Sequence, residues 1–163
     1  MGSDSDLKTL KPAIDTLREF GIKTEVCILS AHRTPIEMME YAKNAESENI
    51  KVIIAGAGGA AHLPGMLASI TCIPVIGVPV ESKTLKGIDS LLSIVQMPAG
   101  IPVATVAING SQNAGLLAIE MISLFDKSVK ENLKKFRDNL NAQVRTKNNK
   151  LLTIAADNYL QNN

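Results

Sequence analysis

The sequence is poor in aromatic side chains and in cysteine. Its 163 residues include no Trp, two Tyr, three Phe and two Cys. Platforms that stack nucleobases or sugars are therefore excluded as a main feature, because they depend on exposed rings. Cys27 and Cys72 lie in apolar surroundings, and we interpret them as buried thiols of a reducing compartment rather than as a disulfide.

The chain also has almost no net charge and lacks long apolar runs. Its 17 basic and 16 acidic residues give a net charge of +1, so no basic field favours nucleic acid. The apolar runs are far shorter than the ~20 residues that cross a membrane. The polar start at residues 2–6 is unlike a secretory signal peptide. We therefore expect a cytoplasmic protein that binds neither nucleic acid nor membrane.

What the sequence does contain is an alternation of apolar runs and helical patterns. Strands are predicted at 26–29, 52–55, 74–80 and 103–108, and helices at 7–20, 35–48, 62–71, 87–96 and 113–144. This order predicts an α/β fold, a three-layer parallel sheet with helices on both faces. We expect a single α/β catalytic domain over residues 1–145 and a C-terminal helical tail over 146–163, which packs on a neighbouring subunit.

The polar loop at residues 2–6 has no strand before it. In a doubly wound sheet the first strand is usually central. We therefore expect a first strand to be missing from the chain as given, which would leave a gap in the middle of the sheet. Either native residues precede Met1 or the start of the chain was misassigned.

Three loops follow the positions where strands of such a sheet end, at residues 2–6, 30–34 and 56–62. Functional residues of open α/β sheets lie in loops at the carboxyl ends of strands. His32 on the second loop can give and take a proton near neutral pH, or it can be an ordinary hydrogen-bonded loop histidine. Arg33, just before a helix start, suits a phosphate, although a surface salt bridge is the simpler interpretation.

The other two loops suit an anionic or nucleotide ligand less specifically. Ser3, Ser5 and Asp6 offer hydroxyls and a carboxylate for phosphate or ribose, but helix capping explains them as well. The glycine-rich run at 56–61 matches the dinucleotide fingerprint only loosely. Its small residues allow a ligand close to the backbone, and His62 after it is by itself more often structural. No metal-ligand spacing, Walker motif or nucleophile elbow is present in the sequence.

Four blocks of the sequence together resemble a known family. They are GSDSD at 2–6, SAHRTP at 30–35, AGAGGAAHLPGM at 55–66 and DSLLSIVQMP at 89–98. In this order they resemble the catalytic subunit of phosphoribosylaminoimidazole carboxylase, and most of all its bacterial form, the 5-(carboxyamino)imidazole ribonucleotide mutases. The likeness covers residues 1 to about 140. It implies a flavodoxin-like domain, a homo-octamer and active sites between subunits.

The resemblance also implies a reaction and a set of roles. The family moves a carboxylate from the exocyclic nitrogen of an imidazole ribonucleotide to ring carbon C4, by decarboxylation and recarboxylation. It uses no metal, ATP or organic cofactor. His32 is implied as general acid and then general base. The implied substrate contacts are Ser3, Ser5, Asp6, Ser30, Arg33 and His62, together with Gly58, Gly59 and Ala60 around a carbon dioxide pocket.

Two other functions remain open at this stage. One is the carboxylase form, which takes aminoimidazole ribonucleotide and free carbon dioxide. The other is a flavodoxin-like nucleotide-binding module without chemistry, since one fold hosts many functions. If the chain is the mutase, we expect functional coupling to the ATP-dependent synthetase that makes its substrate.

Overall fold

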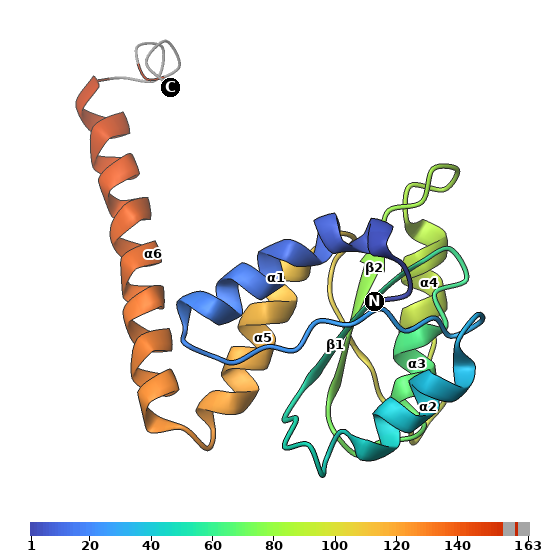
Figure 1. Cartoon of the computed structure of the whole chain (residues 1–163). Helices are drawn as coiled ribbons and strands as arrows, with labels where there is room; N and C mark the ends of the chain where they lie inside the picture. Colours follow the sequence, from blue (N-terminus) through green and yellow to red (C-terminus); the bar gives the residue numbers. More distant parts are fainter. Residues whose placement is uncertain (155–158, 160–163) are drawn as a thin grey trace. The chain divides into compact units, whose positions relative to one another are not determined.

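Three parallel strands form the sheet of the structure, a computed structural model in which residues 1–154 and Tyr159 are described (Figure 1). The strands are β1 (Ile53–Gly58), β2 (Val75–Val80) and β3 (Ala104–Thr105), hydrogen-bonded in that order. β1 and β2 pair along their whole length, with Ile53 opposite Val75. The strand predicted at 74–80 is thus confirmed. The strand predicted at 52–55 also forms, but it continues through Gly58, into the glycine-rich run that was expected to be a loop.

Helices cover both faces of this sheet within the compact unit Met1–Ile122. The helical elements are a 3-10 turn η1 (Asp4–Asp6), α1 (Leu7–Glu19), α2 (Pro35–Asn44), α3 (Leu63–Ala68), α4 (Ile88–Val95) and α5 (Ser111–Ser123). Figure 1 shows α1 and α5 on one side of the strands and α2, α3 and α4 on the other. The predicted three-layer α/β class is confirmed.

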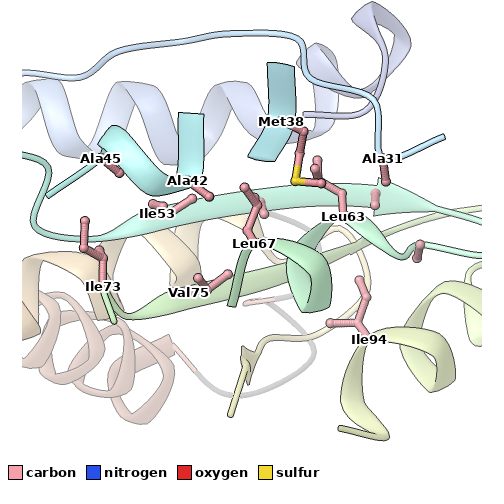
Figure 2. Close-up of a cluster of buried hydrophobic side chains, with 13 residues drawn as sticks. Ala31, Met38, Ala42, Ala45, Ile53, Leu63, Leu67, Ile73, Val75 and Ile94 are labelled. Atoms are coloured by element: carbon pink, nitrogen blue, oxygen red, sulfur yellow. The ribbon is translucent and has the colours of Figure 1, made fainter. Parts of the chain in front are cut away.

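The main core lies between β1 and the layer of α2 and α3 (Figure 2). Met38 of α2 is fully buried and lies over Leu63, while Ala42 lies over Ile53. The small alanine side chains of α2 let the helix lie close to the sheet. Because alternate side chains of a strand point to opposite faces, Ile53 faces this core and its neighbours in β1 face α1.

Close contact on the other face depends on two glycines. A Cβ on Gly56 of β1 would lie 2.9 Å from the side chain of Leu10 in α1. A Cβ on Gly115 of α5 would lie 3.1 Å from the backbone oxygen of Ala13. These glycines allow α1 to pack directly on the sheet and on α5, which fixes the helix that follows the first polar loop.

The predicted strand at 26–29 does not form as a strand. The segment is extended, but Val26 and Ile28 are each about half exposed, at 48% and 55%. A strand needs a neighbour to pair with, and in the described part of the chain only Met1 bonds to this segment's backbone. The predicted strand at 103–108 is reduced to the two residues of β3.

The described residues from Ser123 onward belong to a second unit. The single helix predicted at 113–144 is wrong, because α5 ends at Ser123 and α6 (Lys127–Ile154) begins after a break. The carboxylate of Asp126 accepts the backbone N–H groups of Ser128, at 2.8 Å, and Val129, and so starts a new helix. α6 continues into the C-terminal helical tail predicted at 146–163. The remainder of that prediction, at 155–158 and 160–163, lies outside the described residues.

The two cysteines differ in their exposure. Cys27 is half-buried but Cys72 is exposed, so the prediction of two buried thiols is wrong for Cys72. Among the helices described, none is both long enough and apolar enough to cross a membrane.

Candidate functional site

The structure brings the three predicted loops together at one end of the sheet. The backbone N–H of Gly2 donates to the carbonyl of Gly56 at 3.3 Å, which joins the first loop to β1. The guanidinium of Arg33 donates through Nη2 to the carbonyl of Gly2 at 2.8 Å. His32 contacts His62 across 30 residues of sequence. The loops therefore form one site.

The two histidines form a direct pair. Nε2 of His32 lies 2.7 Å from Nδ1 of His62, and the ring centroids are 4.9 Å apart at an interplanar angle of 85°. One imidazole must donate the proton of this hydrogen bond and the other must accept it. Both side chains are exposed, so a ligand can reach them. The pair can hold and transfer a proton.

The loop that carries His62 has an unusual backbone. Gly59 has φ +67° and Ala61 has φ +46°, in the left-handed region that alanine rarely adopts. Such conformations persist when surrounding structure holds them, and they occur often at functional sites. Ala61 is buried and follows exposed Ala60, so the turn directs the next residue, His62, outward.

Arg33 is positioned by Ser30. The buried Ser30 hydroxyl accepts the backbone N–H and the Nε–H of Arg33, both at 3.2 Å. Thr34 precedes α2 but its side chain makes no capping hydrogen bond, because the hydroxyl turns back toward Ser30. It accepts the N–H of Ser30 at 2.9 Å and donates to the Ser30 carbonyl at 3.3 Å. Residues 30–34 thus form a closed turn that presents His32 and Arg33.

The first loop is closed by its own polar groups. Ser3 donates its backbone N–H to the Asp6 carboxylate at 3.1 Å, and its hydroxyl accepts the N–H of Ser5 at 3.4 Å. This box caps the 3-10 turn, so the capping interpretation holds for Ser3 and Asp6 in this structure. Asp6 is only 8% exposed. Burial raises the pKa of Asp6, and the hydrogen bond from Ser3 and the nearby amino terminus oppose that rise.

The loop after β1 is held by two serines that sequence reasoning did not single out. The fully buried Ser90 hydroxyl accepts the N–H of Gly59 at 2.9 Å and donates to the carbonyl of Val80 at 2.7 Å. Ser93 donates to the carbonyl of Gly59 at 3.4 Å. The signal was present, because both serines lie in the block at 89–98. Gly58 and Ala60 are exposed beside this anchor.

The arrangement suits an anionic ligand and proton transfer. Arg33 uses two of its five N–H donors on the partners described above, and three remain for a ligand. The ionised Asp4 lies near this charge, and the Ser3 and Ser5 hydrogen bonds, with a smaller contribution from Arg33, lower its pKa. Among the residues that the structure describes, no group of three acidic, Cys or His side chains is arranged to hold a metal.

Comparisons with known proteins agree with each other. The family model described as AIR carboxylase matches residues 1–143. The chain is 56% identical over 160 residues to the N5-carboxyaminoimidazole ribonucleotide mutase of Thermotoga maritima. The aligned residues make up 98% of this chain and 94% of that protein. The chain is also 55% identical over 159 residues to the phosphoribosylaminoimidazole carboxylase of Schizosaccharomyces pombe. That alignment takes in 98% of this chain but only 29% of the yeast protein.

A solved structure shares the same fold. The crystal structure of Treponema denticola PurE superposes with a TM-score of 0.85 at 30% sequence identity, over 93% of this chain and 94% of that one. The match agrees with the flavodoxin-like, three-layer arrangement.

Proposed function

The chain belongs to the AIR carboxylase family, and from that premise we infer that it is an isomerase of purine biosynthesis. It converts 5-(carboxyamino)imidazole ribonucleotide to 5-amino-4-carboxyimidazole ribonucleotide. The mutase name belongs to relatives of which the chain covers nearly the whole length, such as that of Thermotoga maritima. The carboxylase name belongs to a fungal protein of which it covers 29%, so the mutase is favoured.

The observation that carries the mechanism is the His32–His62 pair beside Arg33. In the first step the protonated imidazole of His32 gives its proton to the exocyclic nitrogen as the N–C bond of the carbamate breaks. Carbon dioxide and the neutral amine result. In the second step C4 attacks the carbon of carbon dioxide, and neutral His32 then removes the C4 proton. The aromatic ring is restored and no net proton is consumed.

We assign His62 a positioning role. Its ring contacts the His32 nitrogen Nε2 at 2.7 Å, so it can orient the imidazole and stabilise one of its protonation states. A general acid that later acts as a base needs both protonation states during each turnover. A hydrogen-bonding neighbour that can donate or accept serves that need.

The remaining residues bind the nucleotide. Arg33 and the hydroxyls of Ser3, Ser5 and Ser30 are assigned to the phosphate, and Asp6 to the ribose hydroxyls. Support for Arg33 is its fixed position and three free donors. Gly58, Gly59 and Ala60 are assigned to the wall of a small carbon dioxide pocket. Exclusion of water there would keep the released gas from escape and hydration.

We also propose an assembly. Three large apolar side chains of α4 lie one helical turn apart and are about half exposed: Ile88, Leu92 and Val95, at 51%, 52% and 47%. Such a stripe on one helix face is typical of a buried contact. We propose that it is buried between subunits of a homo-octamer, that the protein works in the cytoplasm, and that it receives its substrate from an ATP-dependent synthetase.

The direct test is to incubate the chain with 5-(carboxyamino)imidazole ribonucleotide, without ATP or added metal, and to follow the 4-carboxy isomer against the spontaneous rate. Fast conversion is expected at low bicarbonate. Turnover only of aminoimidazole ribonucleotide with added bicarbonate would favour the carboxylase form instead. A folded protein that turns over neither substrate would favour a binding module.

His32→Asn tests the proton-transfer role. The amide keeps a similar size and a hydrogen-bonding group but cannot transfer a proton, so kcat should fall about 100- to 10,000-fold. His62→Asn is the matched comparison, because it removes the neighbouring imidazole from the same pair. It should cost less in kcat and should change the pH–rate profile. Wild-type turnover by a folded His32→Asn variant would contradict the assignment.

A further inference from the structure

The segment that carries His62 is held at both ends by α4 and the residues that follow it. At its start, the hydroxyl of Ser90 accepts the backbone N–H of Gly59 at 2.9 Å. At its end, the side chain of Met97 lies against Gly65 of α3, where an added Cβ would lie 3.0 Å from Sδ. His62 lies between these two contacts, so the position of its backbone depends on α4 as well as on its own loop.

The contact through Ser90 is fixed from the other side by the sheet. Ser90 is fully buried, and its hydroxyl donates to the carbonyl of Val80, at the end of β2, at 2.7 Å. A serine hydroxyl has a single proton, so this bond leaves the lone pairs of the oxygen for the loop after β1. In that loop the N–H of Ala61 donates to the carbonyl of Gly58 at 3.3 Å, which closes the turn before His62.

This turn is one that depends on an external anchor. Gly59 has φ +67° and Ala61 has φ +46°, and a residue with a Cβ is strained in this region. Strained backbone persists where the surrounding structure holds it. Without the Ser90 hydroxyl, the N–H of Gly59 loses its partner and the turn can relax. The next residue along the chain, His62, would then move relative to His32.

We propose that Ser90 is a positioning residue for the proton transfer, which holds the turn at 58–61 so that His62 stays hydrogen-bonded to His32. The nitrogens Nδ1 of His62 and Nε2 of His32 are 2.7 Å apart, and a shift of about 1 Å would break their bond. The proposal rests on the proposed function, in which His32 moves the proton. Ser90 acts through His62 and not by contact with the substrate.

The test is Ser90→Ala, with Ser111→Ala as the matched control. Ser111 is also fully buried, and its hydroxyl donates to the carbonyl of Thr9 in α1, on the other face of the sheet. Each variant loses a hydrogen bond of a buried serine, so both should lower Tm. Only Ser90→Ala should lower kcat, by about 10- to 100-fold, because small misplacements of groups at a reacting centre reduce the rate this far. KM should change less than kcat, since Arg33 is held by a different turn.

A double-mutant cycle separates positioning from a general loss of structure. If Ser90 acts through His62, Ser90→Ala should cost less than about twofold in kcat when it is combined with His62→Asn. The pH–rate profile of Ser90→Ala should match that of His62→Asn, while Ser111→Ala should keep the profile of the unchanged chain. Equal kcat losses from Ser90→Ala with and without His62→Asn would overturn the proposal.

The histidines themselves provide a readout that does not depend on turnover. The chain has two His, so NMR of the protein with isotope-labelled histidine reports on each ring. One donating and one accepting nitrogen should be in contact in the unchanged chain and in Ser111→Ala, and this signature should be lost in Ser90→Ala. An intact histidine pair in Ser90→Ala would refute the positioning role. Absence of mutase activity in the unchanged chain would instead refute the proposed function.

Ser90→Cys replaces Ser90→Ala if the alanine variant does not fold. The thiol fills nearly the same space as the hydroxyl but is only a weak donor and acceptor. Its effects on kcat and on the histidine pair should have the same direction as those of Ser90→Ala and should be smaller. Wild-type kcat and an unchanged histidine pair in the folded cysteine variant would contradict the proposal.

Discussion

Arg33 combines a buried anchor with an accessible charge. Ser30, which holds its Nε–H and its backbone N–H, is buried, whereas Arg33 itself is exposed. Both bonds come from the turn that contains Arg33, and the Nη2 bond to the carbonyl of Gly2 adds a contact with the first loop, so two segments of the chain hold the guanidinium. A preorganised cation loses little side-chain freedom when it binds an anion.

Arg33→Ala should raise KM for the nucleotide by about 10- to 100-fold. The reason is the loss of charge-assisted hydrogen bonds, each worth ~1.5–3 kcal/mol. The measurement is steady-state kinetics, and kcat should change less than KM. Arg33→Lys keeps the charge but loses the planar fork, and should recover only part of the affinity. A kcat loss as large as that of His32→Asn would place Arg33 in the chemical step instead.

We predict that the ionised carboxylate of Asp6, which is assigned to the ribose hydroxyls, lowers the stability of the fold at neutral pH. Burial raises its pKa above the ordinary value, so folding favours the protonated carboxyl. Its contribution to stability is therefore greatest below the unfolded-state pKa, and is lost as the pH rises through the folded-state pKa. Asn at this position still accepts the Ser3 N–H and carries no charge.

Thermal unfolding of Asp6→Asn and the unchanged chain should follow that sign. The Tm difference should move in favour of the variant between pH 3 and pH 7, while turnover at pH 7 falls. If the difference instead moved in favour of the unchanged chain, the ionised carboxylate would be a net stabilising group and this account would be wrong.

At the scale of elements, Ser90 ties three of them together. It lies on α4, accepts from the loop after β1 and donates to the end of β2. The hydroxyl is fully buried, so both backbone partners depend on it. The glycine-rich loop is in this way fixed to the sheet and not only to its own strand.

Ser90→Ala should lower the free energy of unfolding by about 1–3 kcal/mol, because two partly buried backbone groups lose their partner. Chemical denaturation measures the change. Ser93→Ala is the matched control, since Ser93 is exposed and makes one longer bond to Gly59. It should stay within ~0.5 kcal/mol of the unchanged chain. Equal effects of the two substitutions would contradict the role of Ser90.

Sequence patterns predicted the elements well where one element is stabilised by its own periodicity. The helix predicted at 7–20 and the strand predicted at 74–80 match α1 and β2 closely. They failed where pairing or capping decided the outcome. The run at 26–29 has the composition of a buried strand, but among the residues that the structure describes its backbone bonds only to Met1. The long helix predicted at 113–144 is interrupted because the Asp126 carboxylate caps a new one.

At the scale of the whole molecule, the half-exposed apolar stripe of α4, formed by Ile88, Leu92 and Val95, is the surface that we expect a neighbouring subunit to cover. Leu92→Glu places a charge at its centre and should dissociate the proposed octamer, which native mass spectrometry measures directly. Gln96→Glu adds the same charge at an exposed position just beyond α4 and should leave the assembly intact. An unchanged oligomer in the Leu92→Glu variant would exclude this stripe as the interface.

The sequence by itself determined the three-layer class, most of the helices and strands in their order, the three loops at the site and the family. These follow from local periodicity and from residue types in fixed order, which the chain carries whatever its packing. Only the tertiary structure decided that His32 meets His62 at 2.7 Å and that Ser90 anchors Gly59. Each of these joins segments about 30 residues apart, and their distance depends on how the helices pack on the sheet.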